Sequence, residues 1–244
     1  MIKNIISRIL KPESTDNTLH ADFTANDWET INFVKPYTMT SVERLKSLID
    51  AVNYVSTNGI EGDFVECGTW KGGSVMCMQK KLIELNQTDR KFWVFDTYEG
   101  MPEPDDLDKN FKQTSAQQLM NEEEKEKSLT WAYSNYEETT GNILSTGYPK
   151  EKINFIKGLV EDTIPQTPID KIAILRLDTD WYSSTKFELE HLYPKLVKGG
   201  VLIIDDYGHW EGCRKAVDEY FTNNNIQIFM MRIDYTGRLI IKPH

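Results

Sequence analysis

Two short apolar runs, each ending abruptly in a pair of aspartates, constrain the fold of this sequence more than any other feature. The runs are Ile172–Leu177, followed by Asp178 and Asp180, and residues 201–204 (VLII), followed by Asp205 and Asp206. Runs of this length, rich in Ile, Val and Leu, are typical of strands buried on both faces of a parallel sheet. Residues 183–197 are long enough for a crossover helix, so the carboxyl ends of both strands would meet at one edge of the sheet.

Carboxylates gathered at one edge repel one another unless some take up protons or a cation binds between them. Oxygen ligands from carboxylates, completed by water or substrate, suit Mg²⁺ or another hard divalent cation. Aspartates are also common as solvated turn residues and helix caps where a strand gives way to a helix. Because two such clusters follow neighbouring strands, where open α/β sheets bind ligands, the functional site is the favoured interpretation.

The composition permits one sizeable core and argues against several kinds of partner. A chain of 244 residues with 39% hydrophobic content predicts a single domain over residues 1–244. The net charge of -10 argues against a nucleic-acid or anionic-membrane partner. No run approaches the roughly 20 apolar residues of a membrane span. Polar residues interrupt the apolar residues of positions 1–10 too often for the hydrophobic core of a signal peptide. The cysteines Cys67, Cys77 and Cys213 are too few for a disulfide framework and predict core thiols in the reducing cytoplasm.

The first 36 residues predict an N-terminal arm. Residues 1–10 alternate Ile with Lys, Asn and Arg, which indicates a short amphipathic helix packed on this protein or on a second copy. Residues 12–32 are polar without a strong period and predict an extended stretch. Ser41 has the position of an N-cap, because apolar residues recur at helical spacing from residue 42 to residue 52.

A strand, a glycine-rich turn and a helix start follow one another in residues 63–78, as at the opening of a nucleotide-binding α/β fold. The glycines Gly68, Gly72 and Gly73 do not match the G-x-G-x-x-G spacing of dinucleotide-binding proteins. Glu66 would repel a pyrophosphate but suits a ligand with an ammonium group, which favours S-adenosylmethionine over NAD or ATP. An ordinary tight turn between strand and helix is the alternative.

The next strands supply further candidate contacts. Asp96 ends a predicted strand at residues 91–96, where an acid can hydrogen-bond two ribose hydroxyls. Residues 154–158 predict a third strand, and the segment after it, which contains Asp162, would border an adenine or cap a short helix. Residues 97–150 are a long insertion that predicts a partly helical flap over the crevice, or else a surface excursion.

The C-terminal part predicts a helix at residues 211–221 and a hairpin formed by residues 227–233 and 239–242. This hairpin would add antiparallel edge strands to a mostly parallel sheet with helices on both faces.

Five stretches match one known family when they are taken together. They are residues 37–45 (YTMTSVERL), 62–74 (GDFVECGTWKGGS), 95–104 (FDTYEGMPEP), 175–185 (LRLDTDWYSST) and 199–210 (GGVLIIDDYGHW). With these motifs the chain resembles the macrocin O-methyltransferase family, the TylF/MycF/NovP-like sugar methyltransferases. The resemblance implies a class I methyltransferase (Rossmann-like) fold and the Mg²⁺-dependent transfer of a methyl group from S-adenosylmethionine to a hydroxyl of a sugar or glycoside. It also implies a dimer or larger homo-oligomer in which the N-terminal arm takes part.

The resemblance also implies site residues. By similarity, Asp178, Asp205 and Asp206 are the metal ligands. The implied cofactor contacts are Thr38, Met39, Ser41, Glu66, Gly68, Ser74, Asp96, Val160, Glu161 and Asp162.

A hydroxyl is a poor nucleophile because it holds its proton tightly, and chelation to Mg²⁺ makes it more acidic. Asp178 is the first candidate for the base that takes this proton, and Asp180 is the second. His209 is a further candidate base, although a histidine beside a metal cluster can also serve only to orient the substrate.

Other readings share part of this pattern. A catechol-type phenol or another vicinal diol would use the same metal chemistry. A non-catalytic S-adenosylmethionine-binding module would have no need of the full carboxylate set, and a metal-dependent hydrolase would leave Glu66 and Asp96 unexplained.

Overall fold

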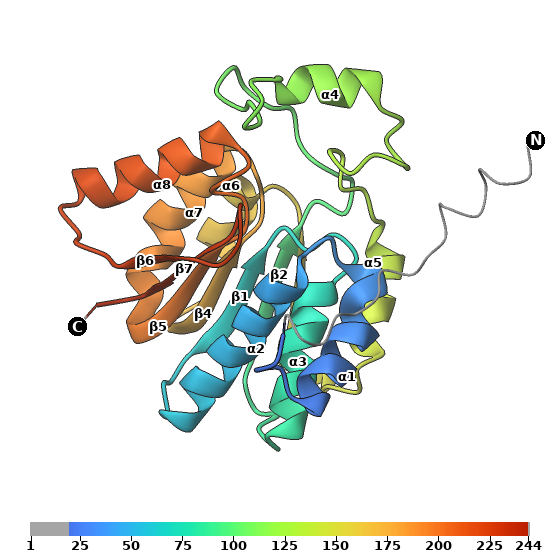
Figure 1. The fold of residues 1–244 in the computed structure, drawn as a ribbon, viewed down its shortest axis with the longest axis vertical. Coiled ribbons are helices and arrows are strands. Elements are labelled where there is room, and N and C mark those ends of the chain that lie inside the picture. Colours follow the sequence, from blue (N-terminus) through green and yellow to red (C-terminus); the bar gives the residue numbers. More distant parts are fainter. Residues whose placement is uncertain (1–19, 244) are drawn as a thin grey trace, which may run out of the picture.

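The computed structural model describes residues 20–243, which contain one seven-stranded sheet in the order β3-β2-β1-β4-β5-β7-β6 (Figure 1). The first five strands are parallel to one another, whereas β6 and β7 form an antiparallel hairpin that pairs with β5. The strands are β1 (Asp63–Cys67), β2 (Phe92–Asp96), β3 (Ile153–Lys157), β4 (Ile172–Leu177), β5 (Leu196–Ile204), β6 (Met230–Arg232) and β7 (Arg238–Ile241). The mostly parallel sheet with a C-terminal antiparallel edge is confirmed.

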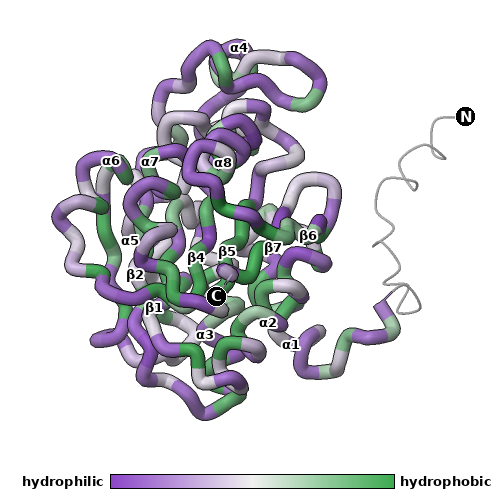
Figure 2. The backbone as a smooth tube through the Cα atoms, turned by 90° about the vertical axis from the view of Figure 1, so that its left-hand side faces the viewer, coloured by the Kyte–Doolittle hydropathy of each residue, from purple (hydrophilic) through white to green (hydrophobic). Residues whose placement is uncertain are grey.

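Helices cover both faces of the sheet (Figure 1). On one face lie α1 (Ala25–Val34), α2 (Val42–Thr57), α3 (Gly73–Glu84) and α5 (Tyr136–Leu144), and on the other lie α6 (Val160–Thr163), α7 (Tyr182–Leu192) and α8 (Glu211–Asn223). Single-turn 3₁₀ helices occur at Lys35–Tyr37, Lys150–Lys152, Ile164–Gln166 and Tyr193–Lys195. Each helical layer forms its own hydrophobic core with the sheet, and the tube in Figure 2 is accordingly most hydrophobic along the central strands.

The central strands are continuous apolar runs because their side chains enter both cores. In β4, Leu175 and Leu177 pack toward α7 and α8, whereas Ala173 and Ile174 pack toward α2 and α3. All six residues of β4 are buried, and its bounds are those predicted from the sequence. Strand β5 begins earlier than predicted, at Leu196, and β6 is only three residues long.

The predicted extended stretch at residues 12–32 is wrong for its second half, because α1 begins at Ala25. Thr24 and Asp27 form a capping box: the Asp27 amide donates to Thr24 Oγ1 (3.2 Å) and the Thr24 amide donates to Asp27 Oδ2 (2.8 Å). Ile31 and Val34, three residues apart, then bury one side of the helix against α2 and α3. The helix predicted at residues 1–10 lies outside the described residues.

The insertion at residues 97–150 is partly helical, as predicted. Its helix α4 (Ala116–Glu122) stands beyond the carboxyl end of the sheet, whereas α5 packs beside α3 (Figure 1). Within residues 20–243, no helix combines the length and apolar content needed to cross a bilayer.

The capping box of α1 predicts a specific loss of stability. Thr24→Ala should lower the free energy of unfolding by about 1 kcal/mol, because it leaves the Asp27 amide without its acceptor. Thr24→Ser keeps the hydroxyl and should stay close to the unsubstituted protein. Urea denaturation followed by circular dichroism measures both, and equal stability of the two variants would contradict a role for the capping box.

Candidate active site

A cavity of about 410 Å³ opens at the carboxyl end of the parallel strands. Its walls come from segments far apart in the sequence, because every parallel strand ends at this edge. They are the segment before α2, the turn between β1 and α3, the ends of β2, β4 and β5, the start of α6 and part of the insertion at residues 97–150.

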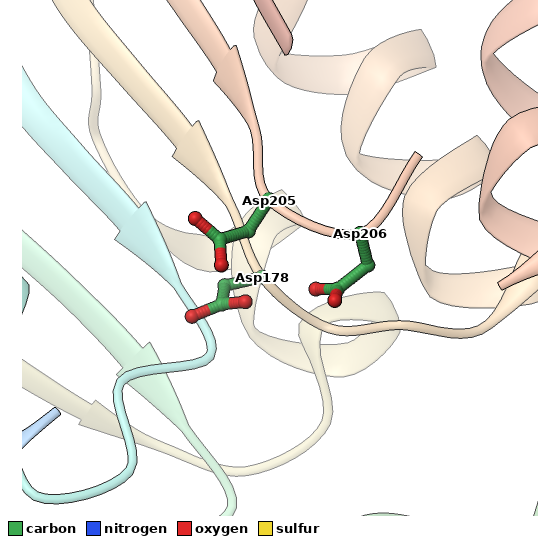
Figure 3. Close-up of side chains that lie close together, drawn as sticks. All are labelled: Asp178, Asp205 and Asp206. Atoms are coloured by element: carbon green, nitrogen blue, oxygen red, sulfur yellow. The ribbon is translucent and has the colours of Figure 1, made fainter. Parts of the chain in front are cut away.

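The aspartates that follow β4 and β5 converge in this cavity. Asp178, Asp205 and Asp206 each place a carboxylate oxygen so that all three lie within 4.8 Å of one another. Figure 3 shows the three carboxylates facing a common space just past the ends of the strands. Backbone hydrogen bonds of the sheet continue one residue past the ends of β4 and β5 and fix two of these aspartates. The Asp178 amide donates to the Cys67 carbonyl (2.9 Å), and the Asp205 amide donates to the Leu177 carbonyl (3.0 Å).

The carboxyl groups of this cluster are poorly solvated and lie close to one another. Burial raises the pKa values of Asp178 and Asp206 well above the ordinary range, and neighbouring carboxylates raise them further. Burial also raises the pKa of Asp180 to about 7. Within the described residues, Asp206 Oδ2 is buried without a hydrogen-bond partner. An all-oxygen donor set with an unsatisfied buried oxygen fits a hard divalent cation.

Two arginines that the sequence analysis did not assign to the site offset part of this charge. Arg176 Nη1 lies 2.7 Å from Asp178 Oδ2, and Arg176 Nη2 lies 2.7 Å from Asp205 Oδ1. Arg44 forms an ion pair with Asp205 and another with Asp234, at 3.0 Å from Nε to Oδ2. A signal for Arg176 was present in the sequence, because it is the one charged residue in the apolar run of β4.

The turn after β1 brings the backbone close to the loop after β4. Gly68 has a φ of 77°, and a Cβ at this position would overlap the carbonyl of Asp178. Only glycine satisfies both the left-handed conformation and this close approach.

Asp96, at the end of β2, stabilises the same turn. Its Oδ2 accepts hydrogen bonds from the amides of Thr69 (2.7 Å) and Trp70 (3.1 Å), and its Oδ1 accepts one from the Tyr98 amide (2.7 Å). Burial raises the pKa of Asp96, and these hydrogen bonds oppose that shift. Carboxylate oxygens can accept more than one hydrogen bond, so these contacts are compatible with binding of hydroxyls by Asp96, which stays a prediction.

Glu66 lies in the interior of β1 and is only 2% exposed. Its Oε1 accepts from Thr69 Oγ1 (3.3 Å) and pairs with Arg176 Nη1 (3.2 Å), whereas Oε2 is buried without a partner among residues 20–243. Burial raises the pKa of Glu66 to about 8, and Arg176 opposes this shift. An unpartnered buried carboxylate oxygen fits the predicted recognition of an ammonium group.

His209 stands at the mouth of the cavity, with Nδ1 at 3.1 Å from the Tyr235 hydroxyl. Its ring packs edge-on against Phe111 at a centroid distance of 5.3 Å. Burial lowers its pKa, with the charges of Arg44 and Lys112 acting in the same direction. The imidazole is therefore neutral at pH 7 and retains a lone pair that can accept a proton.

Most of the predicted site residues lie together. Those that line the cavity are Thr38, Met39, Gly68, Ser74, Asp96, Val160, Glu161, Asp178, Asp180, Asp205, Asp206 and His209.

Three of the predicted cofactor contacts are not among the residues that line the cavity. Glu66 is buried, and Asp162 is exposed on α6. Ser41 caps α2 by accepting from the Arg44 amide (3.2 Å), and it donates to Asp234 (2.8 Å). The cofactor roles of all three remain predictions.

A further buried carboxyl supports the loop that carries the aspartates. Thr179 Oγ1 lies 3.0 and 3.1 Å from the two carboxyl oxygens of Glu188, which is fully buried on α7. Glu188 has a pKa that burial raises well above its ordinary value. It holds Thr179 between Asp178 and Asp180, where the backbone of Asp180 has a φ of 64°. Sequence reasoning missed Glu188, which reads as an ordinary polar residue of a surface helix.

The family model described as Macrocin-O-methyltransferase (TylF) matches residues 7–242 of this chain. The chain belongs to the macrocin O-methyltransferase family. It is similar to the demethyldecarbamoylnovobiocin O-methyltransferase of Streptomyces niveus, with 32% identity over 97% of this chain and 89% of the relative. A second relative, from Streptomyces olivaceus, is 34% identical over 86% of this chain and 76% of its own length, and is named as the 4'-O-methyltransferase of 8-demethyl-8-(2,3-dimethoxy-alpha-L-rhamnosyl)-tetracenomycin-C.

The structure of the O-methyltransferase NovP is similar in three dimensions, with a TM-score of 0.74, 33% sequence identity, and coverage of 85% of this chain and 83% of that one. The family and this likeness confirm the class I methyltransferase fold. They also show the chain to be an S-adenosylmethionine-dependent O-methyltransferase.

The close approach at Gly68 predicts a binding defect. Gly68→Ala should weaken S-adenosylmethionine binding at least about tenfold, because the added methyl group forces the β1 turn away from the Asp178 backbone. Gly141→Ala is the matched control, since a Cβ at this position in α5 meets no atom within 4 Å. Titration calorimetry measures both affinities, and a Gly68→Ala protein that binds the cofactor normally would contradict the predicted role of this turn.

Proposed function

We propose that this enzyme transfers the methyl group of S-adenosylmethionine to a sugar hydroxyl of a glycoside, with a divalent cation held by Asp178, Asp205 and Asp206. The observation that carries the proposal is that these carboxylates converge in the cavity that Gly68 and Asp96 also line. A cofactor site and a cation site are thereby adjacent. The Streptomyces olivaceus relative, named for methylation of a rhamnosyl group, supports a sugar as the acceptor.

The charge balance of the site supports a cation. Four aspartates line this part of the cavity, at positions 178, 180, 205 and 206, and two arginines, Arg44 and Arg176, pair with them. Even before Glu66 and Asp234, which pair with the same arginines, are counted, the ionised aspartates exceed the arginines by two formal charges, and this excess of negative charge favours a divalent cation. When bound, this ion would polarise the acceptor hydroxyl and lower its pKa.

The chain's own residues would then act on the proton of that hydroxyl. Asp178 is the first candidate base, because it lies in the carboxylate cluster and desolvation makes it more basic than an exposed aspartate. Asp180 is the second candidate, with a pKa raised by burial to about 7. Neutral His209, held by Tyr235 at the cavity mouth, either accepts the proton in their place or orients the sugar.

The cavity walls orient the reactants and exclude water. Bound S-adenosylmethionine supplies the electrophilic methyl group. Catalysis would come mainly from alignment of the hydroxyl with this group, together with removal of its proton. Trp210, which lines the cavity and packs edge-on against the fully buried Trp181 at 4.9 Å, gives one wall a rigid backing.

Loss of a proposed cation ligand should remove turnover without removing cofactor binding. We expect Asp206→Asn to reduce methyl transfer on the order of 100-fold or more, because one of three charged ligands is lost. Calorimetric binding of S-adenosylmethionine should persist, since none of the predicted cofactor contacts is changed. Asp170→Asn, an exposed position just before β4, is the matched control and should leave both quantities unchanged.

The assay follows transfer of labelled methyl groups to a panel of glycosides, free sugars and catechols, with Mg²⁺ and with EDTA. The proposal predicts labelled glycosides only in the presence of Mg²⁺. Full activity in EDTA would contradict the cation mechanism. Labelling of catechols alone would contradict the sugar acceptor.

A further inference from the structure

Arg176 is a charged residue in the middle of a buried strand. It is 2% exposed, and β4 is flanked on both sides by the parallel strands β1 and β5. A guanidinium in such a place is destabilising unless charged and polar partners surround it. Four partners from four different elements or loops do so, which makes Arg176 more than a local ion-pair residue. They are Glu66, Asp178 and Asp205, and the Thr40 hydroxyl, which accepts from Nη2 at 3.1 Å.

The acidic partners of Arg176 belong to two different parts of the proposed site. Asp178 and Asp205, each 2.7 Å from a guanidinium nitrogen, are proposed cation ligands. Glu66, at 3.2 Å, is the acid predicted to meet the ammonium group of the cofactor. Among residues 20–243, Glu66 has hydrogen bonds to Oε1 only, and its Oε2 is left without a partner. One positive charge is therefore shared between the cation site and the cofactor site.

We propose that Arg176 is a positioning residue that couples these two sites, with opposite effects on their ligands. It opposes binding of the divalent cation, because it already neutralises Asp178 and Asp205. It favours binding of S-adenosylmethionine, because its charge stabilises the ionised form of Glu66 that an ammonium group pairs with, and because it holds Oε1, which leaves Oε2 for that group. This inference rests on the function proposed above.

The two effects follow from Coulomb's law and from the cost of burying a lone charge. A second cation placed near the guanidinium is repelled at a separation of a few ångströms, where the interior screens poorly. Burial disfavours the ionised form of Glu66, so removal of its cationic partner makes it more costly for Glu66 to ionise when an ammonium group binds. Arg44 cannot replace Arg176 in this role, because its acidic partners in the structure are Asp205 and Asp234.

The test is a pair of binding measurements on Arg176→Met, which removes the charge and keeps an unbranched apolar stem. We expect the affinity for Mg²⁺ alone to rise at least about threefold and the affinity for S-adenosylmethionine, measured without metal, to fall at least about tenfold. Titration calorimetry measures both without any need for turnover. A purely structural role predicts that both affinities fall together.

Two further variants keep the test decisive. Arg176→Lys retains the positive charge but loses the two guanidinium nitrogens that pair with Asp178 and Asp205. The Mg²⁺ affinity of this variant should therefore lie closer to that of the unsubstituted protein than the affinity of Arg176→Met does. Arg90→Met is the matched control, because Arg90 is a half-buried arginine that donates to the carbonyls of Gly62 and Ile60, at the opposite end of β1 from the cavity. It should change neither affinity.

If Arg176→Met does not fold, Glu66→Gln provides the reciprocal measurement. The measurement is made above pH 8, where the unsubstituted protein carries an ionised Glu66 that the Gln variant lacks. More of the Arg176 charge then acts on the aspartates in the variant, so the affinities for S-adenosylmethionine and for Mg²⁺ should both fall, the latter about twofold or more. An unchanged Mg²⁺ affinity in Glu66→Gln would overturn the coupling, as would shifts of equal sign in a folded Arg176→Met. Failure of the unsubstituted protein to bind Mg²⁺ at millimolar concentration would instead overturn the proposed function itself, and this inference with it.

Discussion

The parallel pairing of β4 with its two neighbours is the constraint on which the site depends. Leu177 pairs with Ile204 of β5 and with Cys67 of β1, so the residues that follow all three strands emerge side by side. A one-residue slip of β4 would turn its side chains to the opposite face of the sheet. The apolar side chains of β4 enter two different cores, which makes such a slip costly. The hydrophobic packing of the sheet thus holds the charged groups at its edge.

The charged groups themselves form a connected set. Arg176 reaches from β4 to Glu66 on β1 and to Asp205 after β5, and Arg44 extends the set to Asp234 in the hairpin. Ser41, the N-cap of α2, donates to the same Asp234, so the start of α2 is tied to the hairpin between β6 and β7. Hydrogen bonds and ion pairs therefore connect α2, in the N-terminal part of the chain, to the C-terminal hairpin across the site. An arrangement of alternating buried charges is stabilising only when every member has a partner, and the carboxylates here exceed the arginines. This imbalance is the physical reason to expect a cation.

The parts of the fold that were predictable from the sequence are those governed by hydrophobic patterning. The bounds of β4 follow directly from the run Ile172–Leu177, and the convergence of Asp178 with Asp205 follows from parallel pairing. Helix α1 was missed because its stabilising feature is a hydrogen-bonded cap at Thr24 rather than a full apolar stripe. The partners of Arg176 and of Glu188 were beyond sequence reasoning, because each pairing joins residues brought together only by the fold. The N-cap role of Ser41 was predicted from the sequence and is confirmed, whereas its contact with the cofactor remains a prediction.

The most direct measurement of the central claim is the position of a bound cation. Crystals of the enzyme soaked in Mn²⁺, which can substitute for Mg²⁺ at oxygen ligands, would locate the ion by its anomalous scattering. The account predicts one strong peak between the carboxylates of Asp178, Asp205 and Asp206, in the cavity proposed to bind the cofactor as well. A peak elsewhere, or none at saturating Mn²⁺ with those carboxylates still paired to Arg44 and Arg176, would contradict it.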